Sequence, residues 1–285
     1  MRAADQPTWG ESGDGEPSDD VVARVLAEGE LTVTGRISDA SNLTLLATAT
    51  ADLGAVGGPV SVECVYKPVR GERPLWDFPD GTLAARERAA YLVSHAAGWD
   101  CVPLTILRPG PYGEGMVQRW ITVPDDAEDT VDLLPVDRMV PGWLPVLRAV
   151  DMDGSDVVVA HADRPALARL AGFDVVVNNA DRKGSHILTS PDGRILGVDH
   201  GLCFHTDNKL RTILWGWAGD DLPAEVRDGV GRLRTALDAD LGEQLDELLT
   251  VTEVTAFRRR LERLLERPVF PRPPTNRTPI PWPPL

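Results

Sequence analysis

Cysteine is scarce in this chain of 285 residues. The three cysteines, Cys64, Cys101 and Cys203, are scattered, which excludes a disulfide framework and a cysteine-based zinc site. No apolar run approaches the ~20 residues that a membrane-spanning helix needs. The stretch from Met1 to Asp20 is acidic and polar rather than basic and then apolar, so we expect no signal peptide. Together these absences predict a cytoplasmic protein.

Positive charge is also in short supply. The chain has 44 acidic and 29 basic residues, a net charge of -15. Such a surface repels nucleic acid and anionic lipid headgroups, so we expect no nucleic-acid binding and no stable membrane insertion. Lysine occurs only at Lys67, Lys183 and Lys209, and the other basic residues are arginines. The abundance of Ala, Asp, Val, Gly and Pro is typical of a high-GC bacterial genome.

The composition is nevertheless that of a globular protein, with 42% hydrophobic residues, and the length allows one domain of two lobes. Residues 1–20 have almost nothing apolar and are predicted to be disordered. The segment Pro268–Leu285 is rich in proline, which favours an extended arm over helix or central strand. We expect this arm to pack along the surface, and a docking role for Trp282 is the less favoured alternative.

The first half of the chain is rich in predicted strands. Alternation and β-branched residues indicate a hairpin of Leu31–Ile37 and Leu43–Thr50 with a polar tip at Ser38–Asn42. Val60–Lys67 and Met116–Val123 are two further predicted strands, and Thr82–Ala97 has the spacing of a helix.

The second half is predicted to be mainly helical. We expect helices at Leu144–Val150 and Arg164–Asn178, and two amphipathic helices within Asp221–Glu266. Ile187–Leu188 and Ile195–Val198 flank a turn and predict a short hairpin. A strand-rich half joined to a helix-rich half predicts an α+β fold with a cleft at the junction.

Two aspartates stand where chemistry is expected. Asp181 lies in a polar loop after an apolar helix, and Asp199 ends an apolar strand and is followed shortly by Gly201. The intervening hairpin would bring the two carboxylates near each other. Such a pair suits magnesium and a nucleophilic hydroxyl, because magnesium takes few protein oxygens besides phosphates. A single aspartate capping a turn would be the plainer interpretation, but the whole arrangement favours a site.

The surrounding segment resembles the catalytic core of the phosphatidylinositol 3-/4-kinase-like superfamily. In pattern it is most like the type II phosphatidylinositol 4-kinases, which carry Asn-x-Asp-Arg-Gly-x-x-Asn and then Ile-Asp-Asn-Gly-Leu-Ala-Phe. It is also similar to a group of actinobacterial proteins related distantly to these kinases. The matching residues are Asn179, Asp181 and Arg182 in the first motif, and Asp199, Gly201, Leu202 and Phe204 in the second.

This resemblance implies a two-lobed protein-kinase-like fold that binds ATP with magnesium or manganese. It makes Asp181 the catalytic-loop aspartate that orients or deprotonates the acceptor hydroxyl, and Asp199 a magnesium ligand. One position departs from the pattern: His186 stands where the family has an asparagine that holds a second metal ion. Imidazole suits manganese or zinc better than magnesium, so His186 is either an altered metal ligand or a packed loop histidine.

Lys67 and Glu87 are the further catalytic candidates. Lys67 ends an apolar strand at the predicted cleft, in a chain that almost never uses lysine, and a phosphate-binding lysine belongs at such a place. The family implies that a helix glutamate holds this lysine, and Glu87 fits that position. Glu87 alone would be interpreted as a solvated helix residue.

The remaining nucleotide contacts are predicted at the hairpin tip and the hinge. Ser38 and Ser41 would lie over the phosphates, where hydroxyls and backbone N–H groups can bind anionic oxygens. Gln118 and Trp120 lie on a strand that resembles the hinge between lobes, although Trp120 could equally pack in a core. The predicted boundaries are 21–117 for the N-lobe, 118–124 for the hinge, 125–267 for the C-lobe and 268–285 for the proline-rich tail.

Three functions remain open at this point. The first is a kinase-like phosphotransferase that uses Mg- or Mn-ATP. Because the chain is acidic and lacks a cysteine-rich palmitoylation insert, its acceptor is expected to be a protein or small-molecule hydroxyl rather than a lipid. The second is a nucleotide-binding pseudokinase without efficient transfer, and the third is a scaffold that binds a partner through its tail. The sequence does not separate phosphate from AMP transfer, and it leaves the oligomeric state open.

Overall fold

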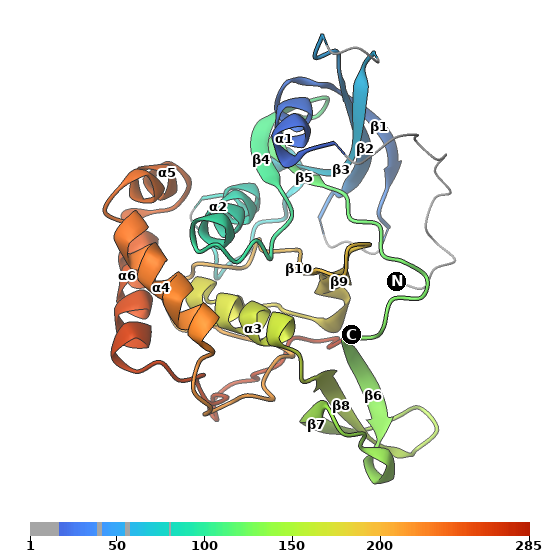
Figure 1. Ribbon diagram of the computed structural model, residues 1–285, viewed down its shortest axis with the longest axis vertical. Coiled ribbons are helices and arrows are strands. Elements are labelled where there is room, and N and C mark those ends of the chain that lie inside the picture. The colour runs from blue at the N-terminus through green and yellow to red at the C-terminus, as the bar shows by residue number, and fades with distance from the viewer. Residues whose placement is uncertain (1–16, 39–41, 55–57, 80) are drawn as a thin grey trace.

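The computed structural model describes residues 17–285 except 39–41, 55–57 and 80. A strand-rich part, blue to blue-green, lies above a helix-rich part, yellow to red, and further green strands lie at the bottom (Figure 1). This arrangement confirms the predicted α+β class. Residues 1–16, most of the segment predicted to be disordered, lie outside the described residues.

The upper part is a five-stranded antiparallel sheet in the order β1-β2-β3-β5-β4. α1 (Asp19–Glu28) covers one face. Alternation along β3 sends Cys64 and Tyr66 under α1, while Val65 and Lys67 lie half-buried on the opposite face. The strands are β1 (Glu30–Arg36), β2 (Leu45–Ala51), β3 (Val60–Pro68), β4 (Thr105–Gly110) and β5 (Gly113–Arg119), with a 3-10 turn η2 (Val69–Gly71) after β3.

Helix α2 (Leu83–Ala96) follows this turn and packs into the lower core rather than under α1. Its N-terminus is capped twice, because Thr82 Oγ1 accepts from Ala85 N at 3.0 Å and the Glu72 carboxylate accepts from Leu83 N and Ala84 N. Each good cap stabilises a helix by about 1 kcal/mol. The start of α2 is therefore firmly placed, and with it the helix face that carries Glu87.

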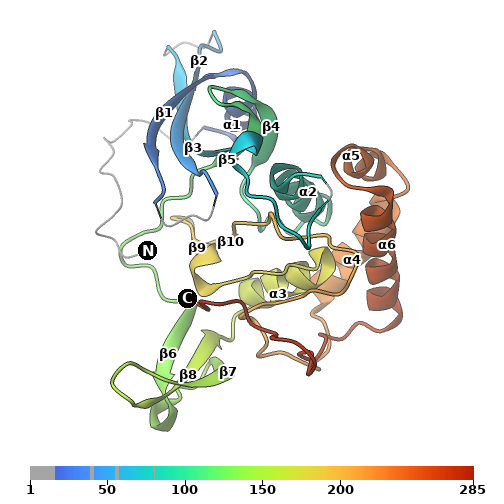
Figure 2. The ribbon, with the colours of Figure 1, turned by 180° about the vertical axis from the view of Figure 1, so that it is seen from behind.

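The lower part is a helical layer around one apolar core (Figure 2). Its helices are α3 (Pro165–Val177), α4 (Ala224–Ala236), α5 (Asp240–Leu248) and α6 (Val251–Glu266), and its short hairpin consists of β9 (Ile187–Thr189) and β10 (Ile195–Gly197), preceded by the 3-10 turn η4 (Gly184–His186). Where two helices were predicted within Asp221–Glu266 the structure has three, because the chain turns at residues 237–239 and again at Thr250, which begins α6 with a capping box.

The helix predicted at Leu144–Val150 is wrong. This segment is strand β7 (Trp143–Val150), which pairs with β8 (Asp156–Ala162); β6 (Val131–Pro135), followed by the 3-10 turn η3 (Val136–Arg138), pairs with the other side of β8. The deciding signal is the turn after β7, where Asp151 and Ser155 are joined by a backbone hydrogen bond and Gly154 has φ +81°. Such a turn closes a hairpin, and pairing with β8 then outweighs the helical spacing.

The tail Pro268–Leu285 has no helix and follows the lower core, as expected from its proline content. Leu222 N donates to Pro268 O, Thr212 N donates to Pro279 O at 3.1 Å, and Gly184 N donates to Pro284 O at 2.8 Å. The tail therefore ends beside the loop that holds Asp181. Among the described residues, no helix is both long and apolar enough to cross a membrane.

Candidate active site

The loop that carries Asp181 begins where α3 ends. Asn178 ends the helix in the left-handed conformation with φ +56°. Next to it, Asn179 Oδ1 accepts from Asp181 N at 2.9 Å, and its amide nitrogen donates to Asp174 Oδ1 at 2.9 Å. The Asn179 side chain thus ties the backbone of Asp181 to helix α3.

A fully buried ion pair lies beneath this loop. Arg182 and Asp174 have no exposed side-chain surface, and their charged groups meet at 3.0 Å. Arg182 also donates to the carbonyls of His186 and Val198. Because one guanidinium contacts α3, η4 and the end of β10, it fixes the distance between the two segments that carry Asp181 and Asp199.

Asp199 stands two residues after β10 with φ +61°, a conformation that is costly for a residue other than glycine. Lys67 Nζ donates to its Oδ1 at 2.9 Å and to Glu87 Oε1 at 2.7 Å. The second Glu87 oxygen accepts from the backbone N–H of His200 at 2.9 Å. Glu87 therefore holds both the lysine and the chain next to Asp199, so that β3, α2 and the end of β10 converge on one point.

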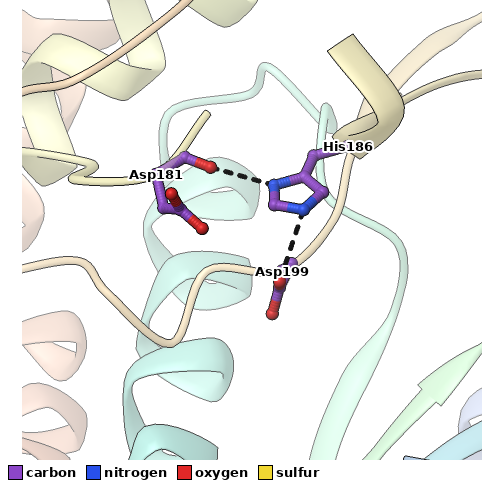
Figure 3. Close-up of side chains that lie close together, drawn as sticks. All are labelled: Asp181, His186 and Asp199. Atoms are coloured by element: carbon purple, nitrogen blue, oxygen red, sulfur yellow. Dashed lines mark hydrogen bonds and ion pairs between the residues drawn. The ribbon is translucent and has the colours of Figure 1, made fainter. Parts of the chain in front are cut away.

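His186 completes the group. One ligand atom each from Asp181, His186 and Asp199 lie within 4.8 Å of one another (Figure 3). His186 Nδ1 is 2.9 Å from the backbone carbonyl of Asp181, which can only accept, so Nδ1 carries the proton. The other nitrogen, Nε2, faces Asp199 Oδ2 at 3.4 Å. In the neutral ring Nε2 bears a lone pair, and a lone pair that faces a carboxylate oxygen is an arrangement that a cation would stabilise.

The charges of the group follow from burial and contact. Burial lowers the pKa of His186 to about 4, which keeps the ring neutral at pH 7. The Lys67 ammonium holds the pKa of Asp199 well below its usual range. Burial raises the pKa of Asp181, and the nearby Lys183 ammonium partly offsets that rise. Burial would lower the pKa of Lys67, but Asp199 and Glu87 raise it above its usual value.

The residues predicted to contact the nucleotide lie in different surroundings. Ser38 follows β1 and is exposed on the hairpin, whereas Ser41 lies outside the described residues. Gln118 is buried in β5, where its amide donates to Thr105 Oγ1 at 2.8 Å. β5 ends at Arg119 rather than Val123, and the backbone N–H of Trp120 donates to Glu63 O at 2.9 Å. The Gln118 side chain and the backbone N–H of Trp120 thus form hydrogen bonds with neighbouring strands or the residues at their ends in this structure.

Two residues beside the site carry roles that the sequence did not reveal. Asp174 accepts hydrogen bonds from Arg182, Asn179 and Thr212, and so organises the Asp181 loop from within α3. The available signal was one acid inside the apolar run from Phe173 to Val177. Lys183, whose Nζ lies 3.2 Å from Asp181 Oδ2, belongs to the rare lysines, and that rarity was its signal.

The architecture is similar to that of solved structures, one of them a kinase at a TM-score above 0.5. The crystal structure of the Golgi casein kinase with Mn/ADP bound matches with a TM-score of 0.51 and 13% identity, and covers 87% of this chain and 74% of that chain. The structure of hydra Fam20 with sugar has a TM-score of 0.48 and 15% identity, and covers 88% of this chain and 90% of that chain. The first of these likenesses shows the fold, which is the two-lobed kinase-like fold.

No protein-family model matches the chain. Protein Rv2133c of Mycobacterium tuberculosis is 54% identical over 267 residues, which covers 91% of this chain and 94% of the relative. Identity at this level over nearly the whole of both proteins requires common descent and one fold. The chain therefore belongs to the same family as Protein Rv2133c.

Proposed function

We propose that this protein is an ATP-dependent phosphotransferase that acts on a protein or small-molecule hydroxyl. The observation that carries the proposal is the convergence of Lys67, Glu87 and Asp199 from three separate elements, with Asp181 on the facing loop. Phosphoryl transfer is catalysed mainly by positioning and by stabilising negative charge, and these side chains supply both. Within the proposal, 21–117 is the N-lobe, 118–124 the hinge, 125–267 the C-lobe and 268–285 the tail, and the lineage is phosphatidylinositol 3-/4-kinase-like.

The donor set suits a divalent cation. Asp199 and Asp181 offer carboxylate oxygens and His186 offers Nε2, and this mixed set favours manganese over magnesium. The Golgi casein kinase structure, which has the same fold, holds Mn/ADP. When bound, the metal would neutralise the charge of the nucleotide phosphates.

Each residue of the site would have a separate role in phosphoryl transfer. Lys67, held by Glu87, would donate its third N–H to the phosphates, because its ammonium has three donors and two of them bind Glu87 and Asp199 in the described structure. Asp181 would accept the proton of the acceptor hydroxyl, or orient that hydroxyl, from a carboxylate whose backbone N–H is fixed by Asn179. Ser38, which follows β1, would contact the phosphates.

One observation favours a second function, a nucleotide-binding pseudokinase. His186 stands at the position where the resemblance implies an asparagine, so metal binding and transfer need not go together. The two functions differ in turnover: both require metal-dependent ATP binding, but the phosphotransferase alone transfers the phosphoryl group.

The test is calorimetric titration of ATP with Mg²⁺ and then Mn²⁺ into wild type and Asp199→Ala, followed by ATP turnover in wild type and Asp181→Ala. We expect metal-dependent binding that Asp199→Ala abolishes and turnover that Asp181→Ala abolishes. Binding without turnover would select the pseudokinase. Absence of binding with either metal, in protein shown to be folded, would contradict both functions.

A further inference from the structure

Three chain segments lie side by side next to Asp181. Arg211 N donates to Asn179 O at 2.9 Å, and Arg182 forms a parallel bridge with Thr212. On the other side, Thr212 N donates to Pro279 O of the tail at 3.1 Å. The loop of Asp181, the residues around Thr212 and the tail therefore form one continuous surface.

The pairing decides which side chains this surface presents. Arg182 and Thr212 both bind Asp174 in the interior. Side chains alternate along extended chain, so Asp181 and Arg211, which precede them, face the opposite, outer side together. Arg211 is held there, because its Nε donates to Ala180 O at 2.7 Å. Its fork is thus fixed beside the carboxylate of Asp181.

The charges on this outer side are mostly positive. Lys183 contacts Asp181, but Arg211 and Arg277 have no ion-pair partner among the residues that the structure describes. The hydrogen bond from Thr212 N to Pro279 O brings the tail near Arg277 against the segment of Arg211. Burial, together with the positive charge of Arg211, lowers the pKa of Arg277. The missing partner does not reflect a shortage of acidic residues, since the chain has 44 of them. Two guanidinium groups on one surface that form no ion pair within the described part of the chain indicate that an anion from outside belongs there.

We propose that Lys183, Arg211 and Arg277 bind the acceptor through carboxylates that flank its hydroxyl, so that the acceptor is an acidic polypeptide segment. The proposal rests on the proposed phosphotransferase function. The three cations come from separate segments and each is partly exposed, an open arrangement that suits spaced charges along an extended chain. Their charge also offsets the repulsion that the net charge of -15 would impose on an acidic acceptor.

The test measures binding rather than transfer. A dye-labelled peptide with glutamates around a serine is titrated with the full chain by fluorescence anisotropy, in the presence of Mn²⁺ and ADP. A matched peptide with glutamine at each glutamate is titrated in parallel. We expect the glutamate peptide to bind about tenfold more tightly, with a preference that weakens as salt rises. The affinity for ADP, measured beforehand, tests the nucleotide site separately.

Variants then locate the contact. Arg277→Gln should weaken binding of the glutamate peptide by about tenfold, and Arg277→Lys, which keeps the charge, by less. Arg272→Gln, an exposed arginine of the same tail, is the matched control and should bind as wild type does. Equal binding of the two peptides, or equal losses in Arg277→Gln and Arg272→Gln, would overturn the proposal. Displacement by a sugar phosphate without any binding of the glutamate peptide would overturn the polypeptide assignment.

Discussion

Two clusters of charged side chains lie within one loop of each other. They differ in burial and in how many of their polar atoms have a hydrogen-bond partner. In the Asp174–Arg182 cluster both side chains have 0% exposure, and Asp174 accepts from Arg182, Asn179 and Thr212. In the Lys67–Asp199 cluster the Asp199 side chain is 49% exposed, and its second oxygen faces a nitrogen lone pair of His186. The first cluster is complete within the protein, whereas under the proposed function a cation would complete the second.

This difference separates stability from function. A buried charge that loses its partner is costly, since no water replaces the lost interaction. A half-exposed charge that loses its partner is solvated, so its removal changes stability little. We therefore expect substitutions in the first cluster to unfold the protein, and substitutions in the second to leave a folded protein without its ligand.

Asp174→Asn should have the largest effect on stability. It leaves the Arg182 guanidinium buried without a countercharge, which costs about 3–5 kcal/mol. Urea denaturation followed by circular dichroism measures the loss, and Asp246→Asn, an exposed aspartate of α5, is the matched control. A loss no greater than that of the control would show that the buried pair does not hold the site together.

Asp199→Asn should change stability little and turnover strongly. We expect its free energy of unfolding to change by less than about 1 kcal/mol in metal-free protein. Turnover should fall about a hundredfold or more, because the charge that would hold the metal is gone. Denaturation and an ATP turnover assay on the same preparation give both values. Unchanged turnover would remove Asp199 from the proposed site.

His186→Asn tests whether the imidazole of the second cluster binds the metal. An amide oxygen replaces Nε2, so the ratio of manganese to magnesium affinity should fall by about tenfold, or 1.4 kcal/mol. Titration of each metal in the presence of ADP measures this ratio. If the ratio does not move, His186 is a packed loop histidine that lies near the carboxylates without binding metal.

Asp181→Asn should have the smallest effect on stability, seen in metal-free protein as a change of the free energy of unfolding with pH. Burial raises the folded-state pKa of Asp181 above its unfolded value, so the ionised form destabilises the fold at pH 7. The variant should then be more stable than wild type by about 0.5 kcal/mol at pH 7. This gain should shrink as pH falls through the folded pKa and vanish below the unfolded pKa. A gain that grows with acidity would contradict the assignment.

The sequence predicted the elements whose signals are local. The hairpin before β3 and the helix around Glu87 have clear periodicity, and the order of these elements led to the α+β class. Asp181 and Asp199 were recognised as a pair because a short hairpin separates them, and the structure brings them together. Their roles in catalysis remain predictions.

What was missed depends on contacts that periodicity does not reveal. β7 was interpreted as a helix, but the turn after it pairs it with β8 in a hairpin. Asp174 looks like an isolated acid in a helix until Arg182, eight residues further on, folds back onto it. The path of the tail to Gly184 follows from packing of Phe270 and Ile280, which periodicity does not reveal in a proline-rich segment.

The sparing use of lysine has a practical consequence. Each of the three side-chain ammonium groups contacts an aspartate: Lys67 meets Asp199, Lys183 meets Asp181, and Lys209 meets Asp77 at 2.9 Å. An amine-reactive label, or an acylating metabolite, thus meets no lysine side chain that is free of an ion pair. Modification of a lysine side chain would break one of these three ion pairs, so dyes and surface coupling for this protein should be directed to carboxylates.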